Sequence, residues 1–380
     1  RTDGTATNTA LIKDINPTGD ANVDQLTVIS NERALFVATD GNGDRELWTS
    51  DGTEAGTNRV LNVTPGQASS NISEITALGG GRALFVVKTG QRSQIWITDG
   101  TEASTTPVSD ITFNNADGEN PLALTALSNG TALFRASATG ETGQKLWITD
   151  GTPAGTQQLK DINLSSGNSP FSFGEFGSGR VLFQASDGSD GFELWISDGT
   201  EENTQRLKDI NAGAASSNPT GFTTIGESQA VFSADNGTSG REVWITDGTE
   251  AGTQILKNIS ANTTSSNPSE FTAIASGQVL FSAQNNTNGA ELWVTDGTRA
   301  GTTLVQNINP GEASSSPNNF VPVGGGALFS ATSGAGTELW FTDGTRAGTQ
   351  QVADINPNGG SNPTDLAVLS NTQAVFAADD

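Results

Sequence analysis

The stretch Glu291-Leu292-Trp293-Val294-Thr295-Asp296-Gly297-Thr298 decides the fold of this chain, because versions of it recur along its whole length. The tripeptide Asp-Gly-Thr at its end begins at eight positions that lie 47 to 51 residues apart. Repetition at such a period is typical of one supersecondary unit used many times. The eight Asp residues are Asp3, Asp51, Asp99, Asp150, Asp198, Asp247, Asp296 and Asp343.

One period of the repeat predicts four short strands, at residues 270–274, 279–283, 291–295 and 304–308. Apolar and polar residues alternate in them or form short apolar runs, and Ser-Gly or Asp-Gly-Thr turns separate them. A longer Pro-, Gly- and Ser-containing connection leads to the next repeat, as expected between the sheets of a radial array. We therefore predict an all-β, eight-bladed β-propeller of four-stranded antiparallel blades, one domain over residues 1–380. A linear β-solenoid is the structural alternative.

Aromatic residues hold two fixed positions in the repeat. Because strand side chains alternate between faces, Leu292 and Trp293 must point to opposite faces of their blade, which makes both faces apolar. We interpret the Trp residues as packing between neighbouring blades, with sugar-stacking platforms as the alternative. The Trp residues are Trp48, Trp96, Trp147, Trp195, Trp244, Trp293 and Trp340. The preceding strands carry Phe36, Phe85, Phe134, Phe183, Phe232, Phe281, Phe329 and Phe376.

The Asp-Gly-Thr step is interpreted as a structural turn. Asp accepts hydrogen bonds from amides two residues further on, Gly supplies a positive φ, and the Thr hydroxyl satisfies a further turn group. A role in structure is therefore assigned to Asp51, Asp99, Asp150, Asp198, Asp247, Asp296 and Asp343.

One loop before a Trp strand has the residue pattern of a calcium site. Residues 40–46 read Asp-Gly-Asn-Gly-Asp-Arg-Glu, with oxygen-bearing side chains at alternate positions. Asp40, Asn42 and Asp44 are candidate ligands of a calcium ion, with a solvated polar turn as the alternative. No other cofactor is expected.

The composition excludes several kinds of chemistry. The chain has no His, Cys, Met or Tyr, which removes thiol and tyrosine nucleophiles, an imidazole base, and thiolate or imidazole metal sites. Its net charge of −24 disfavours nucleic acid and anionic membrane surfaces as partners. No apolar run approaches the length of a membrane-spanning helix, so no direct membrane insertion is expected.

The strings at residues 46–53, 193–200 and 291–298 resemble the ELWxxDGT repeat family of bacterial proteins. The resemblance covers the whole chain and implies a secreted or surface-exposed bacterial protein. It carries over no catalytic residue. Gln94 and Lys145 replace the Glu of the signature in two repeats, so this Glu is not an obligatory ligand in every blade.

The closing blade is predicted to combine both ends of the chain, residues 1–16 and 362–380. They supply an outer strand near residues 9–15 and two inner strands near 365–369 and 373–378, but no Trp-bearing third strand. A gap would leave unpaired backbone groups on both sides. Flanking residues of a longer protein or a strand added from a neighbouring chain could complete the sheet.

Three function classes follow from these observations. The leading hypothesis is a non-catalytic extracellular structural or interaction module of a bacterial surface or secreted assembly, bound to a protein or glycan at the cell exterior. The alternatives are a carbohydrate-binding propeller and a carboxylate-dependent glycosidase or lyase. The chain itself is expected not to be an enzyme.

Overall fold

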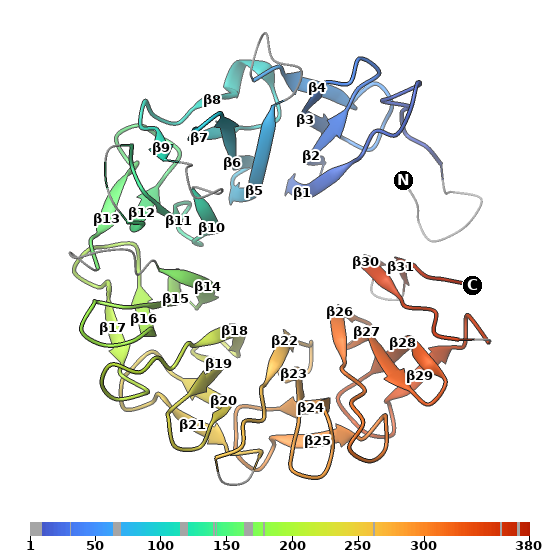
Figure 1. Ribbon diagram of the computed structural model, residues 1–380. Helices are drawn as coiled ribbons and strands as arrows, with labels where there is room; N and C mark the ends of the chain where they lie inside the picture. Colours follow the sequence, from blue (N-terminus) through green and yellow to red (C-terminus); the bar gives the residue numbers. More distant parts are fainter. Residues whose placement is uncertain are drawn as a thin grey trace.

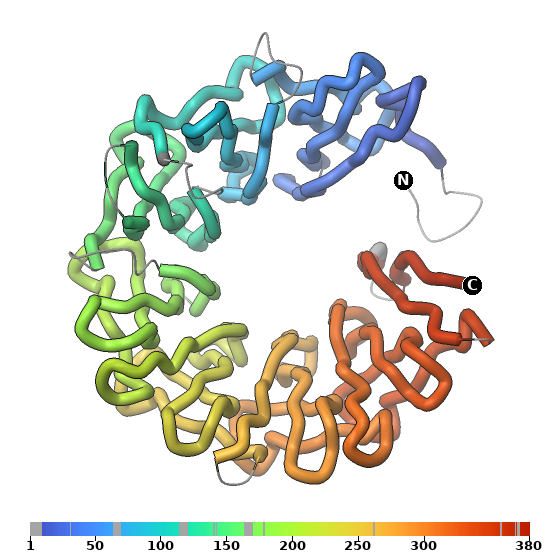
Figure 2. The backbone as a smooth tube through the Cα atoms, viewed as in Figure 1, coloured from blue at the N-terminus to red at the C-terminus, as the bar shows by residue number. Residues whose placement is uncertain are grey.

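The computed structural model describes residues 10–30, 32–63, 70–114, 121–139, 141, 143–162, 170–177, 179–260, 263–357, 359–370 and 373–380. The strands in these ranges form eight sheets arranged in a ring about a common centre, as predicted (Figure 1). The first strand of each sheet lies nearest the centre, and the sheets follow one another in chain order. Figure 2 shows that the ring stays open between the first and the last sheet.

The first four blades cover residues 24–208. Blade 1 contains β1 (Asp24–Ser30), β2 (Arg33–Thr39), β3 (Arg45–Ser50) and β4 (Asn58–Leu61). Blade 2 contains β5 (Asn71–Gly79), β6 (Arg82–Thr89), β7 (Arg92–Thr98) and β8 (Thr106–Pro107), with a short 3-10 helix η2 (Glu102–Ser104) and β9 (Phe113–Asn114), which also pairs with β7. Blade 3 contains β10 (Leu122–Ala126), β11 (Ala132–Ala136), β12 (Lys145–Thr149) and β13 (Gln157–Lys160). Blade 4 contains β14 (Phe171–Phe176), β15 (Arg180–Ala185), β16 (Glu193–Ser197) and β17 (Gln205–Lys208).

The remaining blades cover residues 220–377. Blade 5 contains β18 (Thr220–Ile225), β19 (Gln229–Asp235), β20 (Arg241–Thr246) and β21 (Gln254–Lys257). Blade 6 contains β22 (Ser269–Ala273), β23 (Val279–Ala283), β24 (Glu291–Thr295) and β25 (Thr303–Gln306). Blade 7 contains β26 (Asn318–Val323), β27 (Gly326–Ser333), β28 (Gly336–Thr342) and β29 (Gln350–Ala353). Blade 8 contains β30 (Thr364–Ser370) and β31 (Gln373–Ala377).

Blade 8 differs from the predicted four-stranded unit. Its two inner strands form where the sequence predicted them, and they make a two-stranded sheet among the described residues. The prediction of an outer strand near residues 9–15 was wrong for the described part, residues 10–15, which form no strand. The physical reason is that an outer strand needs a third strand to pair with, and none lies between these residues and β31 in the described chain.

The core lies between the blades. Each Phe of the second strand pairs directly across from the Trp of the third, as Phe232 does with Trp244. Leu292 and Trp293, on opposite faces of β24, are both buried, which confirms that the blades are apolar on both sides. One cluster joins Leu194 of blade 4 to Phe232 and Trp244 of blade 5. Neighbouring blades therefore share a continuous apolar interface.

Candidate functional site

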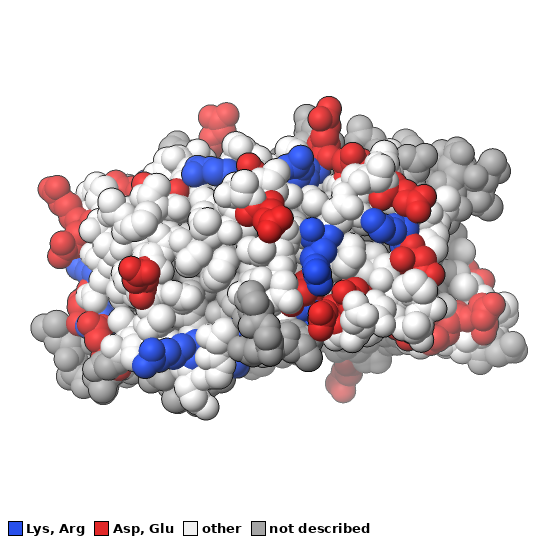
Figure 3. Space-filling view, turned by 90° about the horizontal axis from the view of Figure 1, so that it is seen from above, with Lys and Arg blue, Asp and Glu red and all other residues white. Residues whose placement is uncertain are grey.

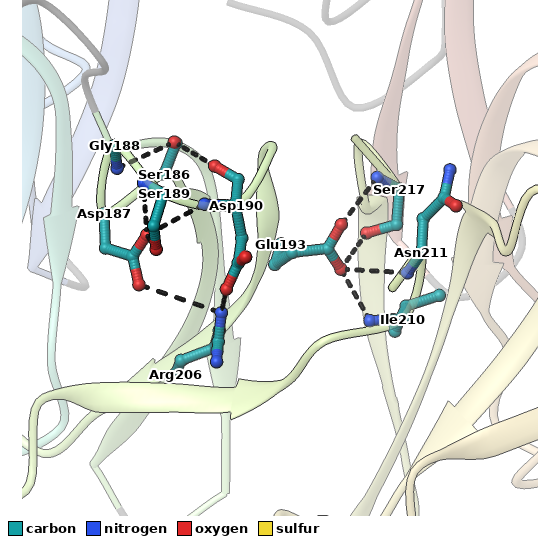
Figure 4. Close-up of polar contacts among 10 residues, drawn as sticks. All are labelled: Ser186, Asp187, Gly188, Ser189, Asp190, Glu193, Arg206, Ile210, Asn211 and Ser217. Carbon is teal, nitrogen blue, oxygen red and sulfur yellow. Dashed lines mark hydrogen bonds and ion pairs between the residues drawn. The ribbon is translucent and has the colours of Figure 1, made fainter. Parts of the chain in front are cut away.

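The Glu that begins the Glu-Leu-Trp string is buried in five blades, where it accepts hydrogen bonds from a Ser and from backbone amides of the connection to the next blade. We call this arrangement the Glu–Ser bracket. In blade 4, the Oε2 atom of Glu193 accepts hydrogen bonds from the backbone N of Ile210 at 2.6 Å and from the Ser217 Oγ at 2.7 Å. Its Oε1 accepts from the backbone N of Ser217 at 2.9 Å. Figure 4 shows the carboxylate pointing toward these groups. Ile210 and Ser217 lie at the two ends of the connection to blade 5, so the bracket fixes the path of the chain between blades.

The same Glu–Ser pair recurs with nearly constant geometry. The Ser Oγ lies 2.6 or 2.7 Å from the Glu carboxylate in each blade, in the pairs Glu46–Ser70, Glu193–Ser217, Glu242–Ser266, Glu291–Ser315 and Glu338–Ser361. All ten side chains are buried. Sequence reasoning quoted this Glu but missed its partner, although the signal was present: a Ser follows the Glu by 23 or 24 residues each time.

Burial controls the ionisation of these carboxyls. Desolvation raises the pKa of Glu193 above its ordinary value, and the hydrogen bonds from Ser217 and from the backbone of Ile210 oppose that rise. The pKa values of Glu46, Glu242 and Glu291 are raised for the same reason. The carboxyls of Glu193, Glu242 and Glu291 act as structural acceptors, because backbone and hydroxyl donors already occupy both of their oxygens.

The two repeats without Glu use other contacts. Lys145 pairs with Glu141 and with Asp161, each at 3.2 Å. Gln94 donates weakly from Nε2 to the carbonyl of Ser109 at 3.5 Å. Because the bracket is replaced in these repeats while the blades still form, its role is to stabilise a connection.

The candidate calcium loop is held by its own amides and by an arginine. The Oδ1 of Asp40 accepts from the backbone N of Asn42 at 2.8 Å and of Asp44 at 3.2 Å. Arg59 of β4 lies 3.6 Å from the Asp40 carboxylate and 4.0 Å from that of Asp44. The arginine therefore competes with a cation for both carboxylates.

In the equivalent loop of blade 4, an arginine of the outer strand also pairs with the loop carboxylates. Arg206 of β17 pairs with Asp187 at 3.7 Å and also with Asp190 (Figure 4). Among the described residues, no group of three or more acidic, His or Cys side chains is arranged to hold a metal ion. Calcium at Asp40, Asn42 and Asp44 stays a prediction.

In the Asp-Gly-Thr turns, the Asp side chain accepts hydrogen bonds from the Thr of the same turn. The Oδ1 of Asp247 accepts from the backbone N of Thr249 at 2.9 Å and from its hydroxyl at 2.6 Å, and these bonds lower the pKa of Asp247. The same contacts form in the other six described turns. A Cβ on Gly252 would lie 2.1 Å from the Asp247 carboxyl, and Gly holds this position in five of the seven described turns. In the other two turns Ser104 and Asn203 hold it, and their side chains donate to the Asp carboxylate.

The Trp side chains are packed and not presented to solvent. All are buried except Trp96, which is half-buried. The indole Nε1 donates to a backbone carbonyl in several blades, for example from Trp244 to Ala234 at 3.1 Å. These side chains leave no free indole face on which a sugar could stack.

The inner strands carry a second repeated feature. Each has a bulge with a left-handed residue, namely Gln25, Glu74, Ala123, Ser172, Gly221, Glu270, Asn319 and Asp365. The Oε2 of Glu74 accepts from the backbone N of Leu124 in the next blade at 3.2 Å, and Glu270 bonds Asn319 in the same way at 3.3 Å. In these two blades the bulge residue therefore links its inner strand to the inner strand of the next blade.

The surface of the ring offers no extended basic region on the side seen in Figure 3. Acidic side chains are spread among uncharged ones there, and Lys and Arg occur singly or in small groups. No helix in the described ranges has the length and apolar character needed to cross a membrane.

The opening of the ring is the part of the described molecule where large apolar side chains are exposed. On the blade 1 side these are Leu11, Val23, Leu26 and Val28, and on the other side Val352, Val368 and Phe376. A cavity of about 650 Å³ lies on the blade 1 side, and one of about 490 Å³ lies between blades 7 and 8. Exposed apolar side chains that gather in one region are typical of an interaction surface.

Comparison with known proteins finds no matching family model and no matching curated protein. Solved structures do match. A pair of prolyl endopeptidases, studied for the role of inter-domain dynamics in catalysis and specificity, gives a TM-score of 0.53 at 11% identity. That match covers 89% of this chain and 51% of theirs. Prolyl oligopeptidase B from Galerina marginata also gives 0.53, at 12% identity, over 89% of this chain and 52% of its own.

A third match is itself a propeller domain. The β-propeller domain of the trilobed protease from Pyrococcus furiosus, described as having an open velcro topology, gives a TM-score of 0.45 at 13% identity. It covers 89% of this chain and 97% of that one. At these identities the likeness shows the fold alone. The fold is a β-propeller of the kind found in these peptidases. The chain spans about half the length of the full peptidases, and membership of the ELWxxDGT family stays a prediction.

These matches correct the function predicted from the sequence. The prediction of a structural or interaction module of a surface or secreted assembly, with a lectin and a carboxylate glycosidase or lyase as alternatives, was wrong, because the propellers that match with a TM-score of 0.53 are parts of prolyl peptidases. The expected extracellular location and the expected lack of enzyme activity stay predictions. Composition could not reveal this, since the repeated residues determine how the blades pack, and blade packing is shared by propellers of different function.

Proposed function

We propose that this chain is the non-catalytic β-propeller domain of a peptidase, or of a complex that contains one, and that it controls which substrates reach the catalytic part. The observation that carries the proposal is that nearly the whole ring corresponds to about half of each matched prolyl peptidase. The ring exposes large apolar side chains at its opening, and through such a surface a propeller can contact another domain or a peptide.

Residue chemistry supports a non-catalytic role. A nucleophile–histidine–acid triad cannot be completed from these 380 residues, because the chain contains no His, and it contains no Cys nucleophile. The buried Glu residues occur singly in five of the blades and are held by Ser and backbone donors. Catalytic groups would therefore have to come from another domain or chain.

The proposal is tested by labelling serine hydrolases in the native complex. The tagged chain is isolated from its source under mild conditions and treated with a fluorophosphonate probe, with untagged extract as the control. We expect a labelled hydrolase, either on the same polypeptide or associated with it, and no hydrolysis of prolyl peptides by the 380 residues alone. Absence of any labelled polypeptide in the isolated complex would contradict the proposal.

A further inference from the structure

An arginine stands immediately before the bracket Glu in blades 1 and 5, at Arg45 and Arg241. The two arginines are equivalent in strand register, because Arg45 pairs with Thr39 across the sheet and Arg241 pairs with Asp235. Their surroundings can therefore be compared position by position.

In blade 1 a carboxylate of the inner strand pairs with the arginine. The Nη2 of Arg45 lies 3.2 Å from the Oδ2 of Asp24, and its Nη1 donates to the carbonyl of Asn22 at 2.8 Å. Asp24 lies opposite Val37 of β2 in the strand register. The guanidinium of Arg45 thus has a counter-ion from its own blade.

The equivalent position on the inner strand of blade 5 is Thr220, which carries no charge. Thr220 lies opposite Ser233 of β19, as Asp24 lies opposite Val37 of β2. Its side chain is half-buried, and its hydroxyl has no hydrogen-bond partner among the described residues. Blade 5 therefore has the arginine of this pair and lacks the carboxylate.

Arg241 makes long hydrogen bonds to neutral acceptors. Its Nη1 donates to the carbonyl and to the Oγ of Ser233 at 3.3 and 3.2 Å, and its Nη2 donates to the carbonyl of Ser217 at 3.3 Å. Hydrogen bonds from a guanidinium to a carboxylate are shorter, at about 2.7–2.9 Å. A guanidinium has five N–H donors, and the Nε of Arg241 has no acceptor in the described part of the chain, so part of its hydrogen-bonding capacity is unused.

The charge of Arg241 is not neutralised by an ion pair within the described ranges. Asp235, its cross-strand neighbour, forms no ion pair with it, and the Oδ1 of Asp235 accepts from the backbone N of Gly237 at 2.8 Å. Ser217 and Ser233 are buried, and Arg241 is half-buried beside them. Burial lowers the pKa of Arg241, and the charge of Asp235 opposes this effect. A half-buried cation without an ion-pair partner is stabilised when an anion binds to it.

We propose that Arg241 and Thr220 form a binding site for the carboxylate group of a ligand, which takes the place that Asp24 has beside Arg45 in blade 1. A carboxylate can accept two parallel hydrogen bonds from one guanidinium, and the Nε and Nη2 of Arg241 form an edge for such a pair. The net charge of −24 repels polyanions, so the ligand class is a monocarboxylate, either the terminal carboxylate of a peptide or a free small acid. The inference concerns binding by the ring itself and holds whether or not the catalytic association above is correct.

The test uses the N-acetylated tetrapeptide Ala-Ala-Pro-Ala with a free terminal carboxylate, the same peptide as its C-terminal amide, and sodium acetate. Binding to the 380-residue chain is measured by titration calorimetry at low ionic strength, because salt screens charge pairs. We expect saturable 1:1 binding of the acid, at least about 10-fold tighter than that of the amide, because hydrogen bonds to charged groups are the stronger ones. Weaker binding of acetate supports a peptide terminus as the ligand, and equal binding of acetate supports a free small acid.

Three variants of the chain locate the site. Arg241→Gln should abolish the preference for the acid over the amide. Thr220→Asp should abolish it as well, because it supplies the carboxylate that Asp24 supplies in blade 1. Arg299→Gln removes an exposed arginine of the blade 6 turn and is the matched control, which should bind as the unaltered chain does. Circular dichroism checks that all three variants remain folded.

The proposal is overturned if the folded chain binds the acid and the amide equally or binds neither the acid nor acetate. It is also overturned if folded Arg241→Gln or Thr220→Asp keeps the preference for the acid. An arginine with a structural role alone would reduce stability when replaced and would give no difference between the two peptides.

Discussion

Ser217→Ala isolates the contribution of one Glu–Ser bracket. The substitution removes only the hydroxyl that donates to Glu193 at 2.7 Å, and both side chains are fully buried. A hydrogen bond to a charged group contributes about 1.5–3 kcal/mol. Glu193 keeps the amide of Ile210 at 2.6 Å and the amide of Ser217 at 2.9 Å, so its charge is not left without donors. We therefore expect a loss of about 2 kcal/mol in the free energy of unfolding.

Urea denaturation followed by circular dichroism measures this loss, and hydrogen exchange at the Ile210 amide shows whether it is local. Ser276→Ala, an exposed loop hydroxyl that contacts Gln278, is the matched control and should change stability by less than about 0.5 kcal/mol. Ser266→Ala should repeat the effect in blade 5, where the geometry is the same. A loss below about 0.5 kcal/mol in both bracket variants would refute the assigned role of the buried carboxylates.

Three further outcomes follow from the packing and the titrating groups. Trp244→Ala should cost about 3–5 kcal/mol in urea denaturation, because the indole fills the interface between blades 4 and 5; a loss under about 1 kcal/mol would contradict core packing. Gly252→Ala should destabilise the blade 5 turn, because its Cβ would meet the Asp247 carboxyl at 2.1 Å, whereas Ala251→Ser on the exposed neighbour should have little effect. Burial raises the pKa of Glu193 above its ordinary 4.5, so the folded state binds this proton more tightly than the unfolded state does. The resulting stabilisation is complete below pH 4.5 and is lost as the pH rises through the raised pKa of Glu193. The lowered pKa of Asp247 acts oppositely, with stability lost as pH falls below about 3.8. The urea midpoint should thus rise on acidification from neutral pH and fall again below about pH 3.8, and Glu193→Gln should reduce the rise; a midpoint that falls steadily from pH 7 would contradict this assignment.

The architecture could be predicted from the sequence because the residue pattern within each repeat determines where its strands and turns lie. The third strand of blade 6 was predicted at residues 291–295 and runs over Glu291–Thr295, and the second strand was equally well placed. Short apolar runs bounded by Gly turns fix strands locally, and eight copies remove most of the ambiguity that one copy would leave.

The contacts that join blades were harder to predict. The carboxyl of Glu193 meets the hydroxyl of Ser217 only because the chain turns back 24 residues later, a relation that local pattern does not encode. Lys13 and Lys208 donate to backbone carbonyls of the next blade, across 44 and 45 residues of sequence. Arg59, which pairs with the candidate calcium loop, lies on a different strand from that loop. All three contacts become visible only when the strands are placed in space.

An open ring can remain folded because each interface between successive blades is complete in itself. An interface combines a Phe–Trp pair, an aliphatic cluster and, in most blades, a Glu–Ser bracket, and none of these uses residues beyond the two neighbouring blades. Stability in such arrays is close to a sum of nearest-neighbour terms, so leaving one interface unmade removes one term without weakening the others.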